Sequence, residues 1–461
     1  MSDAPPRTLA DDLRARTDEA LAVLLRARPD LAATPPADIG QLASRAASRP
    51  SVLWALDRLD TAHLSTLAAM AALEPPVSLE ALRRQVDADD ARIAAMVARL
   101  HASALVWGRD GAWHVVREAR EVLRTYGPRG PYDGPPPVRT REVDDRRHRN
   151  ASAGTVMEVL QRLEHLLGSW GDNPPPVLRS GGRGVRDVRT AATALGVTVD
   201  HVEFLLDLAE SARLLGRAPD DGAGEVWAPT TLFDTWRDSP PAVRWVEVAT
   251  AWLASPGRRV RTQVLRVLSS LDGAAYVDAE EVVEAVAWAV PRADADRDEL
   301  VRRTLVEATR LGVVTLDALS PAGAGLGLPD AAAVVEGLLP SRVDHVLVQA
   351  DLTAVAPGPL EPAVRDRLED VADVESRGGA TVYRFTADSV RRALDRGWPA
   401  SEIHAFVEQV SVTPISMAVM KKVDSGQFKP DQEALKNPPR VLFGAYDGGF
   451  PNTFAGLEAF E

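Results

Sequence analysis

Residues 87–116 read DADDARIAAMVARLHASALVWGRDGAWHVV, and they predict a helix that leads directly into a β-hairpin. The part up to Leu105 has the apolar pattern of a helix. Two β-type runs then flank an Asp-Gly pair, which is a strong signal for a tight hairpin turn. Two more helices are predicted upstream, at 60–73 and 77–86, with Ser78 as the N-cap of the second. The stretch therefore predicts three helices followed by a two-stranded hairpin.

This order of elements is that of a winged-helix module, and it recurs along the chain. A third and looser copy is expected to end in a single strand at 312–319. The predicted fold is mainly α with small β wings, in winged-helix-like modules, plus a small C-terminal α+β domain. The predicted parts are an N-terminal helical segment (1–59), winged-helix-like modules (60–126, 151–240 and 241–340), a Pro/Arg-rich linker (127–150), the α+β domain (341–414) and an atypical tail (415–461).

The composition is that of a soluble globular protein. The chain has 461 residues, of which 45% are hydrophobic and 26% charged, which suits three or four domains that each bury a core. It contains no cysteine, so disulfides and Cys-based zinc sites are excluded. No apolar run reaches the roughly 18 residues of a membrane-spanning helix, and the N-terminus lacks the pattern of a secretory signal. We expect a cytoplasmic protein, nucleoid-associated if it binds DNA, with no metal and no cofactor.

The charge distribution limits how this chain could contact DNA. A formal net charge of −13 argues against a surface that is basic throughout, so any contact has to come from a local patch. All four lysines lie between Lys421 and Lys436, and the other 49 basic residues are arginines, which suit bidentate contacts to phosphate. Codon bias in a GC-rich genome is the alternative explanation. The tail after Ile415 holds five of the nine phenylalanines and none of the ten tryptophans, so we expect it to have a different origin and to pack poorly.

A series of short motifs lies in residues 346–414: a -VQ-D-T- strand, the block VESRGGATVYR, a T--S--RAL--G helix and a last helix that ends near S-TP. Together they resemble the XPB/Ssl2 helicase N-terminal domain, also called a helicase-associated domain. The array before them resembles large actinobacterial proteins that carry this domain near their C-terminal end. The residues that match are Gln349, Asp351, Thr353, Glu375, Ser376, Tyr383, Arg384, Ser389, Arg392, Ala393, Leu394, Gly397 and Thr413.

The resemblance implies an association with DNA unwinding or repair, but the sequence holds no ATPase motor. A P-loop needs Gly-x4-Gly-Lys-Ser/Thr, and none of the four lysines precedes serine or threonine. No DEAD or DEAH box follows an apolar strand either. We therefore expect a non-catalytic, DNA-associated adaptor and no enzyme, with a separate helicase or repair factor as a protein partner. The alternative is a protein-interaction scaffold or a helicase-regulating subunit without direct DNA contact.

Three groups of residues are candidates for nucleic-acid contact. They combine arginines with glycines or with an aromatic side chain, the residue types that approach phosphates and stack on bases. For each group the alternative is a solvated or ion-paired surface, and the mixed segment 139–149 is expected to be a solvated linker. The candidates are Arg179, Arg183, Arg186 and Arg189 in RSGGRGVRDVR; Arg258, Arg259 and Arg261 in PGRRVR; and Arg377, Tyr383, Arg384, Arg391 and Arg392 around VESRGGATVYRF.

The third helix of each predicted module begins with acidic residues, at Asp89, Asp200 and Asp296. In helix-turn-helix proteins this helix meets base edges with its N-terminal part. Carboxylates there would repel phosphates, whereas acids at a helix N-terminus complement the helix dipole by ~0.3–1 kcal/mol. We therefore predict that the three helices are structural or protein-facing.

Overall fold

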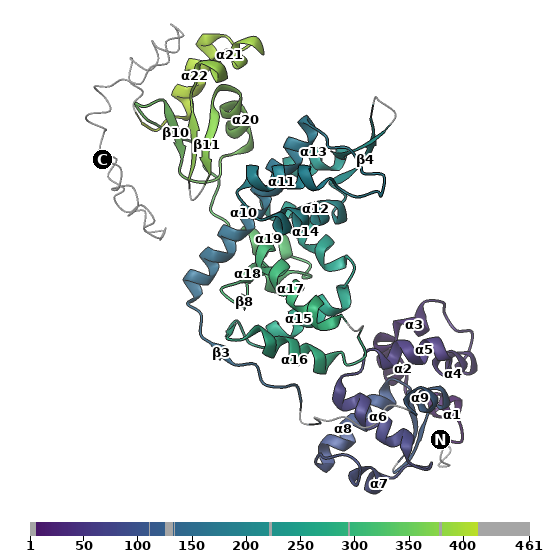
Figure 1. Cartoon of the computed structure of the whole chain (residues 1–461). Helices are drawn as coiled ribbons and strands as arrows, with labels where there is room; N and C mark the ends of the chain where they lie inside the picture. Colours follow the sequence, from purple (N-terminus) through teal and green to yellow (C-terminus); the bar gives the residue numbers. More distant parts are fainter. Residues whose placement is uncertain are drawn as a thin grey trace. The chain divides into compact units, whose positions relative to one another are not determined.

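The computed structural model describes residues 6–109, 111–124, 132, 134–220, 224–293, 296–377 and 380–413. It is mainly helical, with small two-stranded sheets and one four-stranded antiparallel sheet (Figure 1), which confirms the predicted fold class. The chain divides into two compact units, residues 1–233 with 243–334 and residues 234–242 with 335–461. None of the described helices is long and apolar enough to cross a membrane. The predicted tail, 415–461, lies outside the described residues.

The N-terminal segment is held to the rest of the first unit by a buried carboxylate. Asp12 accepts hydrogen bonds from Arg16 at 2.9 Å, from His101 at 3.0 Å and from the N–H of Gly108 at 3.3 Å. Burial alone would raise the pKa of Asp12, but His101 and Arg16 bring it below its usual value. The segment comprises α1 (Leu9–Arg14), α2 (Asp18–Ala27), α3 (Pro29–Ala32), α4 (Ile39–Ala46) and α5 (Arg49–Leu56).

Module 1, residues 61–123, has the predicted order of helices and hairpin. Ser78 caps the second helix by accepting from the N–H of Ala81 at 3.0 Å, which confirms its predicted role. The backbone of Val77 pairs with that of Trp113 in a single antiparallel bridge beside the hairpin. The elements are α6 (Thr61–Ala72), α7 (Leu79–Arg83), α8 (Asp90–Ala102), β1 (Val106–Arg109), β2 (Ala112–Val115) and α9 (Arg117–Leu123).

Module 2, residues 145–230, repeats this arrangement around a long first helix. The backbone of Pro176 pairs with that of Val226, at the place that Val77 and Trp113 occupy in module 1. The elements are α10 (Asp145–Asp172), α11 (Val185–Leu195), α12 (Val199–Ser211), β4 (Leu215–Pro219) and β5 (Glu225–Pro229). α13 (Thr231–Asp238) and α14 (Pro241–Ala254) follow in the chain.

Module 3, residues 258–325, is a third copy with a shorter hairpin. The sequence predicted a single strand at 312–319. This prediction is wrong, because the stretch folds back on itself as a hairpin. Leu316 and Asp317 both have left-handed backbones (φ 55° and 63°), as a tight two-residue hairpin turn requires. The elements are α15 (Arg258–Ser269), β6 (Ala275–Tyr276), α16 (Ala279–Ala289), α17 (Arg297–Leu311), β7 (Val314–Thr315), β8 (Ala318–Leu319) and α18 (Pro321–Gly325), followed by α19 (Ala331–Glu336).

The same hydrogen-bonded junction joins the third helix to the hairpin in all three modules. A residue with a left-handed backbone ends each helix: Ala104 (φ 55°), Arg213 (φ 61°) and Gly312 (φ 82°). The N–H of the next residue donates to the carbonyl five positions back, at 3.1, 2.8 and 2.9 Å respectively, which is the Schellman arrangement of a helix end. The repeat is therefore one of backbone geometry, although the three modules share few residues.

The segment 139–149 was expected to be a solvated linker; it is mostly exposed, as expected, but it is not an irregular linker. Residues Thr140–Arg141 form β3, which pairs antiparallel with β6 of module 3. Arg139 donates its backbone N–H to Glu281 at 2.7 Å, and Arg141 forms an ion pair of 2.8 Å with Asp317. From Asp145 onward the chain is already the helix α10. Arg139 and Arg141 therefore tie the start of this segment to module 3, while most of its other charged residues stay exposed.

The C-terminal α+β domain has a sheet whose strands run in the order β11-β12-β10-β9. Thr386 and Ser389 form a reciprocal capping box at the start of α21, and Gly397 just beyond that helix has φ 94°, so both predicted helix boundaries are confirmed. The elements are β9 (Leu347–Val348), β10 (Thr353–Ala356), α20 (Pro362–Val371), β11 (Asp373–Arg377), β12 (Thr381–Arg384), α21 (Ala387–Asp395) and α22 (Ala400–Val410).

Candidate nucleic-acid interface

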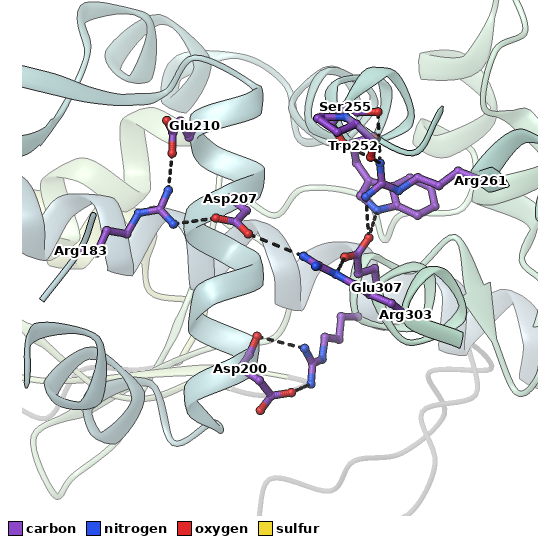
Figure 2. Close-up of polar contacts among 11 residues, drawn as sticks. Arg183, Asp200, Asp207, Glu210, Trp252, Ser255, Arg261, Arg303 and Glu307 are labelled. Carbon is purple, nitrogen blue, oxygen red and sulfur yellow. Dashed lines mark hydrogen bonds and ion pairs between the residues drawn. The ribbon is translucent and has the colours of Figure 1, made fainter. Parts of the chain in front are cut away.

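Ion pairs join the third helices of modules 2 and 3. Asp207 of α12 lies 3.8 Å from Arg303 of α17 (Figure 2), and Arg310 of α17 pairs with Asp200 at the start of α12. Hydrogen bonds from Thr198 and Arg310 lower the pKa of Asp200 to about 2. The acidic face of α12 is therefore turned toward arginines of the same chain, as expected for a structural helix.

Arg183, a predicted contact residue, is fixed within module 2. Its guanidinium donates to Asp207 at 2.6 Å and pairs with Glu210 (Figure 2), and its side chain is only 14% exposed. Its Cζ atom lies 5.0 Å from the ring centre of Trp227 on β5, and Cζ of Arg217 lies 5.3 Å from the same ring. These contacts hold the loop before α11 against the hairpin, so the positive charge of Arg183 is largely neutralised within the chain.

The other three arginines of this stretch are exposed. Arg179 lies in the loop before α11, while Arg186 and Arg189 are three residues apart on α11 and so share a face. Their side chains form no hydrogen bond or ion pair with any residue that the structure describes. Three guanidinium groups are therefore available on one part of module 2.

Sequence reasoning missed two further arginines of module 2. Arg213, at the junction after α12, is exposed and its side chain has no described partner. Arg217 of β4 donates to the carbonyl of Gly181 at 2.8 Å, which ties the hairpin to the loop before α11. Arg217 lies in β4, and Arg213 lies two residues before it. The hairpin predicted at this place in the sequence could have pointed to both arginines.

Arg261, predicted to contact nucleic acid, is instead part of a buried ionic network (Figure 2). It donates to Glu307 at 2.9 Å and to Ser255 Oγ at 2.7 Å, while Trp252 Nε1 donates to the same carboxylate at 2.8 Å. Burial by itself would raise the pKa of Glu307, but the hydrogen bonds from Trp252, Arg261 and Arg303 lower it. With 5% of its surface exposed, Arg261 cannot reach a phosphate, because it lies on the inner face of α15.

The two neighbouring arginines of α15 differ from Arg261. Arg258 is exposed, and its side chain has no partner among the described residues. Arg259 is half-buried. Burial and the nearby positive charge of Arg259 lower the pKa of Arg58, at the end of α5. Only Arg258 of this predicted group therefore combines full exposure with the absence of a described partner.

In the C-terminal domain the predicted arginines are engaged with carboxylates. Arg384 donates to Glu375 at 2.8 Å and to the carbonyl of Asp351 at 3.1 Å, and Arg392 donates to Asp373 at 2.7 Å. Both arginines remain partly exposed. These hydrogen bonds join β11 to β12 and to the last turn of α21.

The remaining three candidates of this domain have different positions. Tyr383 belongs to the core and is 4% exposed, so it is not available to stack on a base; strand alternation turns it, like Phe385, toward the covered face. Arg391 is exposed on α21 and has no described side-chain partner. The backbone of Arg377 pairs with Thr381 at the end of β11, and its side chain lies outside the described part.

The -VQ-D-T- motif closes the turn between β9 and β10. The carboxylate of Asp351 accepts from the N–H of Thr353 at 3.1 Å and from its hydroxyl at 2.6 Å. The N–H of Gln349 donates to the carbonyl of Thr353 at 2.8 Å, and Leu352 between them has φ 69°. These residues therefore hold the fold of the domain by local hydrogen bonds.

The titratable side chains in the part of the chain that the structure describes can be compared for metal-ligand clusters and for shifted pKa values. No group of three or more His, Asp or Glu side chains there could hold a metal ion. Burial and the charges of Arg162 and Arg310 lower the pKa of His201 in α12 to about 4. The imidazole of His201 is therefore neutral at pH 7.

Residues 346–427 match the family described as helicase conserved C-terminal domain. The match begins with β9, covers the α+β domain and continues past residue 413, the last described residue. It supports a helicase-associated domain in this part of the chain. A search of the curated proteins found no match.

Proposed function

We propose that this chain is a non-catalytic, DNA-associated adaptor that carries a helicase-associated domain and works with a separate helicase or repair factor. The observation that carries the proposal is the set of exposed arginines on module 2, Arg179, Arg186 and Arg189, which have no described partner. Guanidinium groups without an internal counter-charge suit phosphate oxygens. The family match supports the link to helicases.

The finer assignment is also part of this proposal. The motifs of residues 346–414 resemble the XPB/Ssl2 helicase N-terminal domain, and the array before them resembles actinobacterial proteins that carry it; this resemblance implies an association with DNA unwinding or repair. The sequence contains no Gly-x4-Gly-Lys-Ser/Thr stretch, so we propose that any motor activity belongs to a partner. ATP hydrolysis by the purified chain, with or without forked DNA, should then stay at the level of the buffer. Hydrolysis that DNA stimulates would contradict the non-catalytic part of the proposal.

Binding to DNA is the direct test of the adaptor role. The full chain is titrated against single-stranded, duplex and forked DNA over a range of salt concentrations. We expect binding that weakens steeply with salt, because neutralised phosphates release counterions. The absence of binding to all three DNAs at low salt would overturn the proposal.

A scaffold or helicase-regulating subunit without DNA contact is the second candidate. It is favoured by the ion pairs that join α12 to α17 and by the net charge of −13. In that case the exposed arginines of module 2 would meet acidic groups of a protein partner. The DNA titration separates the two candidates, because only the first requires salt-sensitive binding in the absence of any other protein.

A further inference from the structure

We infer that module 2 contacts DNA through backbone phosphates only and does not read base sequence. This inference rests on the proposed DNA association and names what is bound. Base reading by a helix-turn-helix module needs the N-terminal part of its third helix in the major groove. The side chains on α11 and α12 show whether the third helix of module 2 could enter the groove in this way.

In module 2, arginines of the same chain pair with acidic residues of α12, the helix that would have to enter the major groove. Asp200 pairs with Arg310, and Asp207 lies between Arg183 and Arg303 (Figure 2). For α12 to enter a groove, α17 would have to move away and these carboxylates would then face phosphates. Each of these partly exposed pairs contributes little to stability by itself, but the newly exposed negative charges would themselves oppose binding.

The third helices of the other modules are no better placed to read bases. In the first turn of α17 of module 3, Arg297 pairs with Asp298, and Glu299 adds a second carboxylate. α8 of module 1 begins with Asp89 and Asp90. None of the three therefore presents a positively charged N-terminal turn to a groove, and base contact by the usual helix is not supported.

The available cations lie on the second helix and the hairpin instead. Arg186 and Arg189 share one face of α11, and Arg179 lies in the loop that Arg217 ties to β4. Arg213, two residues before β4, adds a fourth exposed guanidinium to module 2. Contacts to phosphate fix a protein on the duplex but carry no sequence information, so we expect binding of similar strength to unrelated sequences.

The test compares two duplexes of equal length and base composition but unrelated sequence, titrated with the full chain over a salt series. The two dissociation constants should agree within about threefold, because one base-specific contact alone would change the dissociation constant by about 5- to 150-fold. With four phosphate contacts, the slope of log K against log salt should be about −3.6. A preference of about fivefold or more for one duplex would overturn the inference.

A triple variant, Arg179→Gln, Arg186→Gln and Arg189→Gln, locates the contact. It should weaken both duplexes equally and reduce the salt slope by about 2.7. The control replaces three exposed arginines that already have carboxylate partners, Arg84, Arg117 and Arg302, with Gln, which changes the total charge by the same amount. A smaller effect is expected for this control.

The possible failures point to different conclusions. If neither duplex binds at low salt, the proposed function itself fails. If DNA binds but the triple variant and the control behave alike, the proposed function survives and the assignment to α11 and β4 is wrong. Binding of the unmodified chain to an acidic peptide with no binding to DNA would also reject the inference and favour the scaffold.

Discussion

Arg261 of α15 and Glu307 of α17 form an ion pair of 2.9 Å in which both side chains are less than a tenth exposed. The pair joins two helices of module 3, and the indole of Trp252 hydrogen-bonds to the same carboxylate at 2.8 Å. Arg261, which the sequence predicted to contact DNA, therefore stabilises the fold of module 3 instead. Its counter-charge lies 46 residues away in the chain, so the sequence around Arg261 does not reveal that this side chain is paired.

Glu307→Gln should destabilise the protein by about 3–5 kcal/mol, because it leaves the guanidinium of Arg261 buried without a counter-charge. Urea unfolding of the full chain at pH 7 measures the effect. Glu299→Gln is the matched control: Glu299 is largely exposed and lies 3.6 Å from Arg302, so its loss should cost below ~1 kcal/mol. Equal stability of the two variants would contradict the structural role of Arg261.

Stability should fall between pH 6.5 and pH 4 partly because of His201. Its pKa is lowered to about 4 by burial and by Arg162 and Arg310, so the unfolded chain binds this proton first. The contribution of a neutral His201 is therefore complete above pH 6.5 and is lost as the pH falls toward 4. Linkage gives about 1–2 kcal/mol at pH 5 for such a shift.

The measurement is the free energy of unfolding at pH 7 and pH 5 for the unmodified chain and for His201→Asn. The variant should lose less stability between the two pH values, because the titrating group is absent. Buried His148 also has a lowered pKa and keeps its contribution in both proteins. An unchanged pH dependence in the variant would show that His201 does not titrate as proposed.

Thr386→Ala should loosen the start of α21. The substitution removes the acceptor for the N–H of Ser389 and the hydrogen bond from the Thr386 hydroxyl to Asp373, both 3.0 Å long. Loss of an N-cap costs about 0.5–2 kcal/mol. Hydrogen exchange of the α21 amides in the full chain should become faster. Ser401→Ala, at an exposed position of α22, should leave exchange in α21 unchanged, and an equal effect of both would refute the capping role.

Two glycine-to-alanine substitutions should change the stability of the protein in opposite directions. Gly312→Ala forces a side chain onto a left-handed backbone (φ 82°) and should destabilise the protein by about 1–2 kcal/mol. Gly154→Ala, in the exposed right-handed turn of α10 where no atom would meet the added methyl group, should stabilise it by about 0.5–1 kcal/mol. Thermal unfolding of the two variants checks the signs. Destabilisation by both would mean that the φ argument does not govern Gly312.

The sequence by itself determined the features that depend on a few consecutive residues. The cap at Ser78, the hairpin of module 1, the capping of α21 by Thr386 and the left-handed Gly397 are all found as predicted. Each is governed by the backbone preference of one residue type or by a hydrogen bond across three positions. Local rules of this kind act before any tertiary contact forms.

Only the tertiary structure decided which charged and aromatic side chains remain accessible. Arg183 and Arg186 lie in one short stretch, yet Arg183 meets two carboxylates of α12 while Arg186 has no described partner. Tyr383 is directed into the core, and β3 forms in a segment whose composition suggests solvation. A charge is neutralised or left available by partners distant in the sequence, and the packing of helices and strands sets those distances.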